Sequence, residues 1–186
     1  MSKEAIKTKF IICDLDGCLI KSGWIWDVAK EKGFSKDVAF DFFNRSACCD
    51  ACEIDVSLYK YLCFKASGGF RLHFLTARSE VISVETINFI QQKTGLIYGK
   101  EFTISFRPAN DLSSPADSKA RRLDAMIADK KEILLAIDDE DEILKMYQKR
   151  GIKTIKWISG FLPLEIVREF GEQLNGLFGM EVKCLN

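Results

Sequence analysis

Two carboxylates one residue apart follow an apolar run near the N-terminus. Residues 10–17 read Phe-Ile-Ile-Cys-Asp-Leu-Asp-Gly. Such a run, ending at a turn signal, is typical of a buried parallel strand, and ligands in open α/β sheets collect beyond the carboxyl ends of the strands. Carboxylates this close repel one another unless a cation lies between them or one is protonated. Asp14 and Asp16 therefore indicate a site for a hard cation.

Three further segments carry polar side chains at a strand end or at the start of a helix. Because parallel strands end at the same edge of a sheet, these side chains are expected to meet the first pair. They are Thr76 and Arg78 after the apolar run 71–75, Lys119 in a helix that begins at Ser114, and Asp138 with Asp139 after the run 133–137.

Phosphoryl transfer uses side chains of these types. A carboxylate can attack phosphorus as a nucleophile, and a neighbouring carboxylate can serve as general acid and then as general base. The hydroxyl of Thr76 and the charge of Lys119 can hold phosphoryl oxygens, and Arg78 offers a planar second grip on phosphate. Acids from two strand ends can share one Mg²⁺, which prefers oxygen ligands.

The elements that must position these groups alternate along the chain. Alternation of strands and helices predicts an α/β fold, a Rossmann-like parallel sheet with helices on both faces. Residues 19–69 break it with helical patterning alone, which predicts a small helical cap inserted after the first strand. The expected strands are 9–13, 71–75, 102–106, 133–137 and 153–157, and the expected helices are 80–94, 114–129, 140–150 and 163–177.

Length and composition are those of one soluble domain. The 186 residues fit a single unit, 1–186, and the 27 basic and 27 acidic residues give no broad attraction to nucleic acid. No stretch has the roughly 20 apolar residues of a membrane span, and the charged N-terminus lacks a signal peptide's apolar region. We therefore expect a cytoplasmic protein, in the host cytoplasm if it is phage-encoded, and the sequence predicts no protein partner.

The order of the polar segments resembles the four motifs of the haloacid dehalogenase-like phosphatases. Those motifs correspond to Asp-Leu-Asp-Gly at 14–17, Leu-Thr-Ala-Arg at 75–78, Lys119, and Asp-Asp at 138–139. The match spans residues 9–158 apart from the insertion. Arg121 is the alternative motif cation, and the interval from Lys119 to the acidic pair favours Lys119.

The resemblance implies a role for each of these residues. Asp14 becomes the nucleophile and Asp16 the general acid and base, while Thr76 and Lys119 become phosphate ligands. The implied cofactor is Mg²⁺, held by Asp14, the backbone carbonyl of Asp16, Asp138 and Asp139.

Two segments further resemble the 3′-phosphatase domain of bacteriophage polynucleotide kinase. They are Leu-Ala-Ile-Asp-Asp at 135–139 with the helix that follows, and Phe-Arg-Pro-Ala-Asn-Asp at 106–111. This resemblance implies removal of 3′-phosphates from DNA or RNA ends, with Arg78 and Arg107 as substrate-binding residues. Arg107 could instead anchor its loop by pairing with Asp111. No segment resembles the Walker A loop that a kinase half would need.

Several positions depart from that pattern. Glu140 stands where an arginine usually follows the acidic pair, Pro115 replaces an acid, and residues 21–26 lack an expected arginine. Cys18 takes a place where the family commonly has threonine. A nucleotide or a small phosphate ester is therefore the alternative substrate.

Two other classes of protein share parts of the pattern. A catalytically inactive phosphatase fold used for binding would keep the same elements. A receiver-like signalling module also has an acidic pair, a threonine and a lysine. It would need an aspartate at the end of a middle strand, and the run 102–106 does not end in one.

Cysteines and aromatic residues of the insertion leave alternatives open. Cys48, Cys49 and Cys52 could bind zinc, but a fourth ligand with suitable spacing is missing, so buried thiols are favoured. Trp24 and Trp26 could pack within the cap or stack on a nucleobase, with Trp24 as the better stacking candidate. His73, the only histidine, lies inside an expected strand and is interpreted as structural.

Overall fold

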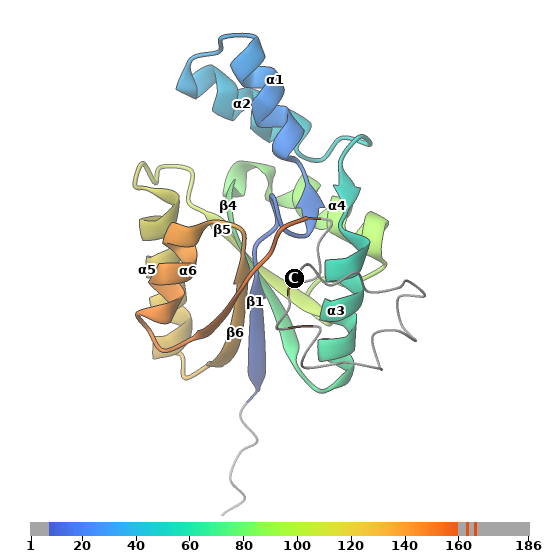
Figure 1. The fold of residues 1–186 in the computed structure, drawn as a ribbon, viewed down its shortest axis with the longest axis vertical. Helices are drawn as coiled ribbons and strands as arrows, with labels where there is room; N and C mark the ends of the chain where they lie inside the picture. The colour runs from blue at the N-terminus through green and yellow to red at the C-terminus, as the bar shows by residue number, and fades with distance from the viewer. Residues whose placement is uncertain (1–7, 160–162, 164–165, 167–186) are drawn as a thin grey trace, which may run out of the picture.

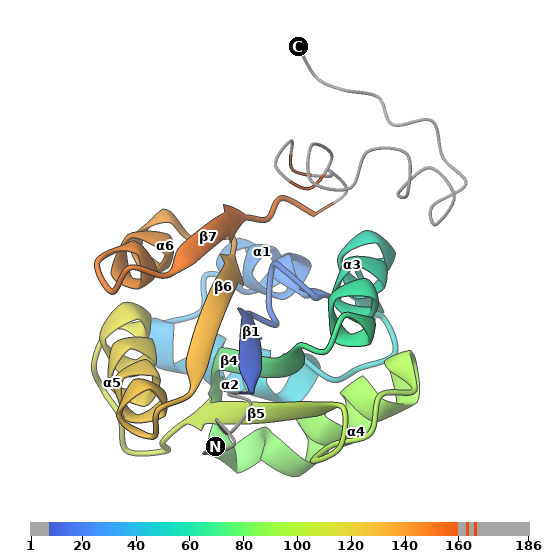
Figure 2. The ribbon, with the colours of Figure 1, turned by 90° about the horizontal axis from the view of Figure 1, so that it is seen from below.

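The computed structural model describes residues 8–159, 163 and 166, and its centre is a parallel five-stranded sheet. The strand order is β5-β4-β1-β6-β7, so β1 lies in the middle, and after β5 at one edge the chain returns past β1 to form β6 and β7 on its other side (Figure 2). The five expected strands and the α/β class are confirmed. The strands are β1 (Lys9–Cys13), β4 (Arg71–Ser79), β5 (Phe102–Arg107), β6 (Glu132–Asp138) and β7 (Lys153–Lys156).

Helices cover both faces of the sheet, as the pattern predicts. Because side chains alternate along β1, Ile11 and Cys13 pack with one pair of helices and Ile12 packs with the other. Ser114 caps α5 by accepting a hydrogen bond from the amide of Asp117 (3.1 Å). The first pair is α3 (Val56–Ser67) and α4 (Ser83–Thr94), and the second is α5 (Pro115–Ala128) and α6 (Asp141–Gln148) (Figure 1).

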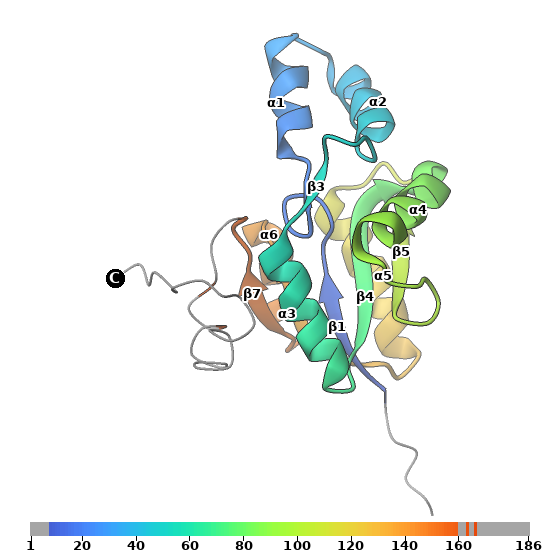
Figure 3. The same ribbon diagram turned by 90° about the vertical axis from the view of Figure 1, so that its right-hand side faces the viewer.

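The segment 19–69 divides into two structural parts. Helices α1 (Gly23–Glu31) and α2 (Lys36–Ser46) stand beyond the carboxyl ends of the strands, as a cap would (Figures 1 and 3). Strand β2 (Ile20–Lys21) pairs antiparallel with β3 (Glu53–Ile54) beneath them. The sequence did not predict these strands, because two residues are too few to form an alternating pattern.

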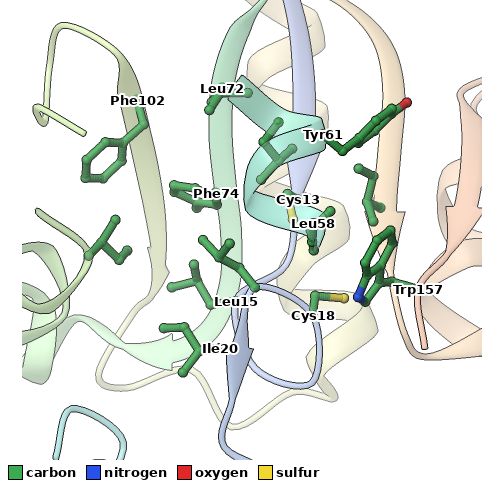
Figure 4. Packing of buried hydrophobic residues seen from close by; sticks show 14 of the residues in the cluster. Cys13, Leu15, Cys18, Ile20, Leu58, Tyr61, Leu72, Phe74, Phe102 and Trp157 are labelled. Carbon is green, nitrogen blue, oxygen red and sulfur yellow. The ribbon is translucent and has the colours of Figure 1, made fainter. Parts of the chain in front are cut away.

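Helix α3, although inside that segment, belongs to the layer that covers the sheet. Leu58 and Leu62 are fully buried in the same cluster as Phe74 of β4, and Figure 4 shows Leu58 close to Cys13 and Trp157. The cap helices are therefore α1 and α2 alone.

Two other expectations have partial outcomes. The predicted helix 80–94 begins as a 3₁₀ turn, Glu80–Ile82, before α4. The predicted helix 163–177 lies outside the described residues except for positions 163 and 166. Within the described part, none of the helices combines the length and apolar character needed to cross a membrane.

Candidate active site

Acidic side chains from two neighbouring strand ends meet at the centre of the sheet. Asp14 directly follows β1, and its amide donates a hydrogen bond to the carbonyl of Ile137 in β6 (3.0 Å). One carboxylate oxygen from each of Asp14, Asp138 and Asp139 lies within 4.8 Å of the others. β1 and β6 pair directly, so the sheet itself fixes this approach. The structure thus brings together the first and last predicted acidic motifs.

Lys119 reaches the same cluster from α5. Its side chain is fully buried, and its Nζ lies 2.9 Å from Asp14 Oδ1 and 2.8 Å from Asp138 Oδ2. Arg121 instead points to the surface, where it pairs with Asp111 at 2.7 Å. Of the two candidate cations, the structure therefore places Lys119 in the site.

The cluster holds more negative charge than Lys119 offsets. Burial raises the pKa of Asp14 to about 7, with the charges of Asp138 and Asp16 adding and Lys119 opposing. Burial, reinforced by Asp14, raises the pKa of Asp139 to about 6. Burial disfavours the charge on Lys119, but Asp14 and Asp138 outweigh it and hold its pKa well above the usual range. The site therefore favours an additional positive charge.

These residues fit a hard divalent cation. Three carboxylates in ligand range are the oxygen donors that Mg²⁺ uses, and the buried Asp14 Oδ1 meets Lys119 Nζ at 2.9 Å. Gly17 leaves the necessary room: a Cβ there would collide with the carboxylate of Asp139, and its φ of +79° also disfavours other residues. Among the described residues, this acidic trio is the single group found with three potential ligands in range, so the three cap cysteines do not form one.

Asp16 is held apart from the trio by a buried arginine. Arg78 Nε lies 2.8 Å from Asp16 Oδ2, and Arg78 Nη2 lies 2.7 Å from Asp16 Oδ1. Ser22 Oγ donates a third bond to the carboxylate, at 2.6 Å. This arrangement fixes the orientation of Asp16 at the edge of the site.

The guanidinium of Arg78 has a protein acceptor for each of its five N–H groups. Besides Asp16, it donates to the carbonyl of Ala47 (3.0 Å), Cys48 Sγ (3.2 Å) and Thr86 Oγ1 (3.2 Å). Arg78 therefore joins Asp16 to the end of α2 and to α4. Phosphate binding by Arg78 stays a prediction, and it would require one of these bonds to break.

Two other predicted substrate ligands take part in local structure. Thr76 is fully buried, and its Oγ1 accepts a hydrogen bond from the amide of Arg78 (3.1 Å). Arg107 donates from Nε to the carbonyl of Asp111 (2.9 Å) and from Nη2 to that of Ser113 (2.5 Å). It therefore anchors the β5–α5 loop through backbone carbonyls, while its side chain still lines the cleft described next.

A cleft of about 1020 Å³ opens above these groups, between the cap and the β5–α5 loop. Asp14, Asp16, Lys119 and Asp139 form its floor. The cap contributes residues of α1 and α2, and the loop contributes residues 107–109 and 111–114. Its volume lies at the upper end of the range for small-molecule sites, roughly 300–1,000 Å³.

Sequence reasoning missed several residues of this site. Ser22 lies directly after β2 and reaches Asp16, a contact that the sequence pattern does not indicate. Trp26 lines the cleft, whereas Trp24, the tryptophan favoured for stacking, is not among the described lining residues. Arg122 binds the carbonyls of Thr76 (2.8 Å) and Ser105 (2.7 Å), and its spacing of three from Lys119 on α5 was an available signal.

The fold is similar to that of solved haloacid dehalogenase-like and phosphatase structures. No protein-family model matches the sequence, and no curated protein matches it. The structure matches a chain of the Pnkp1/Rnl/Hen1 RNA repair complex with a TM-score of 0.62 and 16% identity, over 84% of this chain and 44% of that one. This chain therefore spans less than half of that relative's length.

Two further solved structures share the architecture over most of both chains. A haloacid dehalogenase-like family hydrolase from Streptococcus pneumoniae has a TM-score of 0.58 and 15% identity, over 88% of this chain and 98% of that one. The class C acid phosphatase from Bacillus anthracis has a TM-score of 0.57 and 11% identity, over 99% and 83%. At these identities the likeness establishes the fold.

Proposed function

We propose that this protein is a Mg²⁺-dependent phosphomonoesterase that works through an aspartyl-phosphate on Asp14. The observation that carries the proposal is the position of Asp14, at the floor of a cleft, beside Lys119 and within ligand range of Asp138 and Asp139. A buried carboxylate in this setting is held in place and shielded from water, as a nucleophile toward phosphorus needs to be.

The proposed reaction has two displacements. In the first, a carboxylate oxygen of Asp14 bonds to phosphorus as the ester P–O bond breaks, and Asp16 donates a proton to the leaving oxygen. In the second, Asp16 takes a proton from the water that attacks phosphorus, the bond to Asp14 breaks, and inorganic phosphate leaves. Lys119 stabilises the charge on the transferring group, and Thr76 is proposed as the second phosphate ligand.

Mg²⁺ would be held by Asp14, Asp138 and Asp139, with the carbonyl of Asp16 as a further ligand. When bound, it supplies positive charge to phosphoryl oxygens and offsets the excess of carboxylates.

We further propose that the substrate is a 3′-phosphate at a DNA or RNA end. The volume of the cleft and its open position beneath two short helices support a bulky leaving group. The similarity of fold to a chain from an RNA repair complex also supports a nucleic-acid substrate. A nucleotide or small phosphate ester is the second candidate, because the cleft would also hold a single nucleotide. The proposed location is the cytoplasm.

Asp14→Asn tests the proposed nucleophile. The amide is nearly isosteric but cannot form the intermediate, so phosphate release in the presence of Mg²⁺ should fall by about a thousandfold or more. Thermal unfolding of the variant should stay cooperative, since Lys119 keeps its 2.8 Å contact with Asp138. Unchanged turnover would exclude Asp14 as the nucleophile, and a wild-type protein inactive on every ester would favour a binding protein with this fold.

The substrate is tested by comparing kcat/KM on a 3′-phosphorylated oligonucleotide, its 5′-phosphorylated counterpart and mononucleotides. We expect the first to be preferred. Equal or faster turnover of mononucleotides would instead favour the second candidate.

A further inference from the structure

An aromatic pair forms part of the cap wall of the cleft. Trp26 of α1 stacks on Phe43 of α2, with ring centroids 4.8 Å apart and an interplanar angle of 15°. Phe43 is buried, whereas Trp26 keeps 42% of its surface exposed, and both residues line the cleft. A tryptophan held against a buried ring keeps a fixed orientation while offering apolar surface to a ligand.

This aromatic pair is connected through Arg78 to Asp16, the residue proposed to protonate the leaving oxygen. Arg78 Cζ lies 6.0 Å from the centroid of the Phe43 ring, and the same guanidinium holds both carboxylate oxygens of Asp16. Trp26, Phe43, Arg78 and Asp16 thus follow one another from the cap to the floor. The leaving group of a phosphate ester must lie next to Asp16, in the cleft that Trp26 also lines.

The other groups on the cap wall do not favour a charged leaving group. Lys36, Asp37 and Asp41 of α2 all line the cleft, so the positive charge on this wall is accompanied by negative charge. On the opposite wall, Leu112 is 95% exposed and adds further apolar surface. A flat, uncharged ring matches this environment better than an anionic group does.

We propose that Trp26 is a stacking platform for the nucleobase of the nucleoside that carries the phosphate. The inference rests on the proposed phosphomonoesterase activity and specifies its substrate as one with a base next to the scissile ester. Aromatic stacking accepts any base, because each base has a π-face. Trp26 would therefore favour nucleic-acid ends and nucleotides over aliphatic phosphates without selecting a sequence.

The test compares a 3′-phosphorylated oligonucleotide with the same oligonucleotide whose terminal residue lacks its base. For the wild type, kcat/KM should be higher on the substrate with the base. Trp26→Ala should lower the ratio of the two values by about tenfold. A 3′-mononucleotide and glycerol phosphate form a second pair, which shows whether the base is recognised in a polymer, in a free nucleotide or in both.

Two variants separate stacking from packing of the cap. Trp26→Phe keeps an aromatic ring against Phe43 and should lower the ratio less than Trp26→Ala. Trp24→Ala is the matched control, because Trp24 lies on the same helix with 37% exposure but outside the described lining of the cleft. For Trp24→Ala, the ratio of kcat/KM on the substrates with and without the base should equal that of the wild type.

The outcomes distinguish this inference from the proposed function. If Trp26→Ala lowers kcat/KM equally on the substrates with and without the base, or on neither, the stacking role is overturned. The phosphatase proposal would still stand. If no ester is hydrolysed, the phosphatase proposal fails. Binding of the two labelled oligonucleotides to Asp14→Asn, followed by fluorescence anisotropy, still tests stacking without turnover: Trp26→Ala in that background should remove the preference for the base.

Discussion

Arg78 is a buried residue whose guanidinium is fully engaged by protein acceptors. It is 1% exposed, and its five N–H groups are divided between a carboxylate on the floor and acceptors in the cap and α4. A buried guanidinium needs this degree of pairing, because an uncompensated charge in the interior costs several kcal/mol. Because Arg78 holds both carboxylate oxygens of Asp16, we predict that it serves the proposed reaction as a positioning residue.

Arg78→Lys tests this positioning role. Lysine keeps the charge but cannot hold both carboxylate oxygens in a planar fork, so Asp16 should lose its orientation. We expect kcat/KM to fall by about a hundredfold on an alkyl phosphate, whose leaving oxygen needs a proton, and by much less on 4-nitrophenyl phosphate, whose leaving group does not.

A phosphate ligand would behave differently. If Arg78 gripped phosphate directly, both esters would lose activity to the same extent, and KM would rise for each. Arg121→Lys is the matched control, because Arg121 is not among the described residues that line the cleft and bonds Asp111 and Ser113 from the exposed side of α5. It should leave both rates close to those of the wild type.

Whether the sequence could predict a site residue depends on which part of the fold brings that residue to the site. Asp14, Asp138 and Lys119 could be found from the sequence, because each lies at a strand end or a helix start whose position the fold dictates. The bonds of Arg78 could not, since its acceptors come from segments near 16, 47 and 86 whose meeting depends on the cap. The pattern favoured Trp24 for stacking, whereas Trp26 is the tryptophan that lines the cleft; base stacking itself stays a prediction.

At the scale of elements, the start of α3 is joined to the segment that follows β7. Asp55 is the N-cap of α3 and accepts hydrogen bonds from the amides of Ser57 (3.1 Å) and Leu58 (3.0 Å). Its other oxygen accepts from Trp157 Nε1 (3.4 Å) and Ser159 Oγ (2.9 Å), just beyond β7. Sequence patterning identified the helix but not this long-range contact, because residues 55 and 157 have no local relation.

Asp55→Ala should therefore destabilise the protein more than loss of an ordinary cap. It removes a cap, worth about 1 kcal/mol, and leaves the buried indole N–H of Trp157 without its acceptor, so we expect a loss of about 2–3 kcal/mol in urea unfolding. Ser35→Ala is the control: Ser35 caps α2 at an exposed position through a 3.5 Å bond and should cost less than about 1 kcal/mol. Similar losses for the two variants would contradict the proposed role of the Trp157 and Ser159 contacts.

At the scale of the whole molecule, two buried regions have opposite effects on the stability of the folded state as the pH falls, although the net charge is balanced. The acidic trio has pKa values raised by burial, so protonation there favours the folded state as the pH falls. His73 is also buried, between Thr103 Oγ1 (2.8 Å) and Ser105 Oγ (3.0 Å), and burial, aided by Lys131 and Arg122, lowers its pKa from 6.5 to about 4. Protonation of His73 therefore disfavours the folded state.

The contribution of His73 should appear as a loss of stability in mild acid. Above pH 6.5 the imidazole is neutral in both states and has no effect. As the pH falls from 6.5 to about 4, the unfolded chain takes up the proton and the folded one does not, so the free energy of unfolding falls by about 3 kcal/mol. Because the acidic trio acts in the opposite direction, the wild-type curve alone does not isolate this effect.

Comparison with His73→Gln isolates it, since glutamine can still bond both hydroxyls but does not titrate. Urea unfolding of the two proteins at intervals from pH 7 to pH 4 gives the difference in their free energies of unfolding, in which the carboxylates cancel. As the pH falls, the variant should gain about 3 kcal/mol in free energy of unfolding relative to the wild type. Parallel curves over this range would mean that His73 titrates alike in both states, and that the β4–β5 face is open to water at this position.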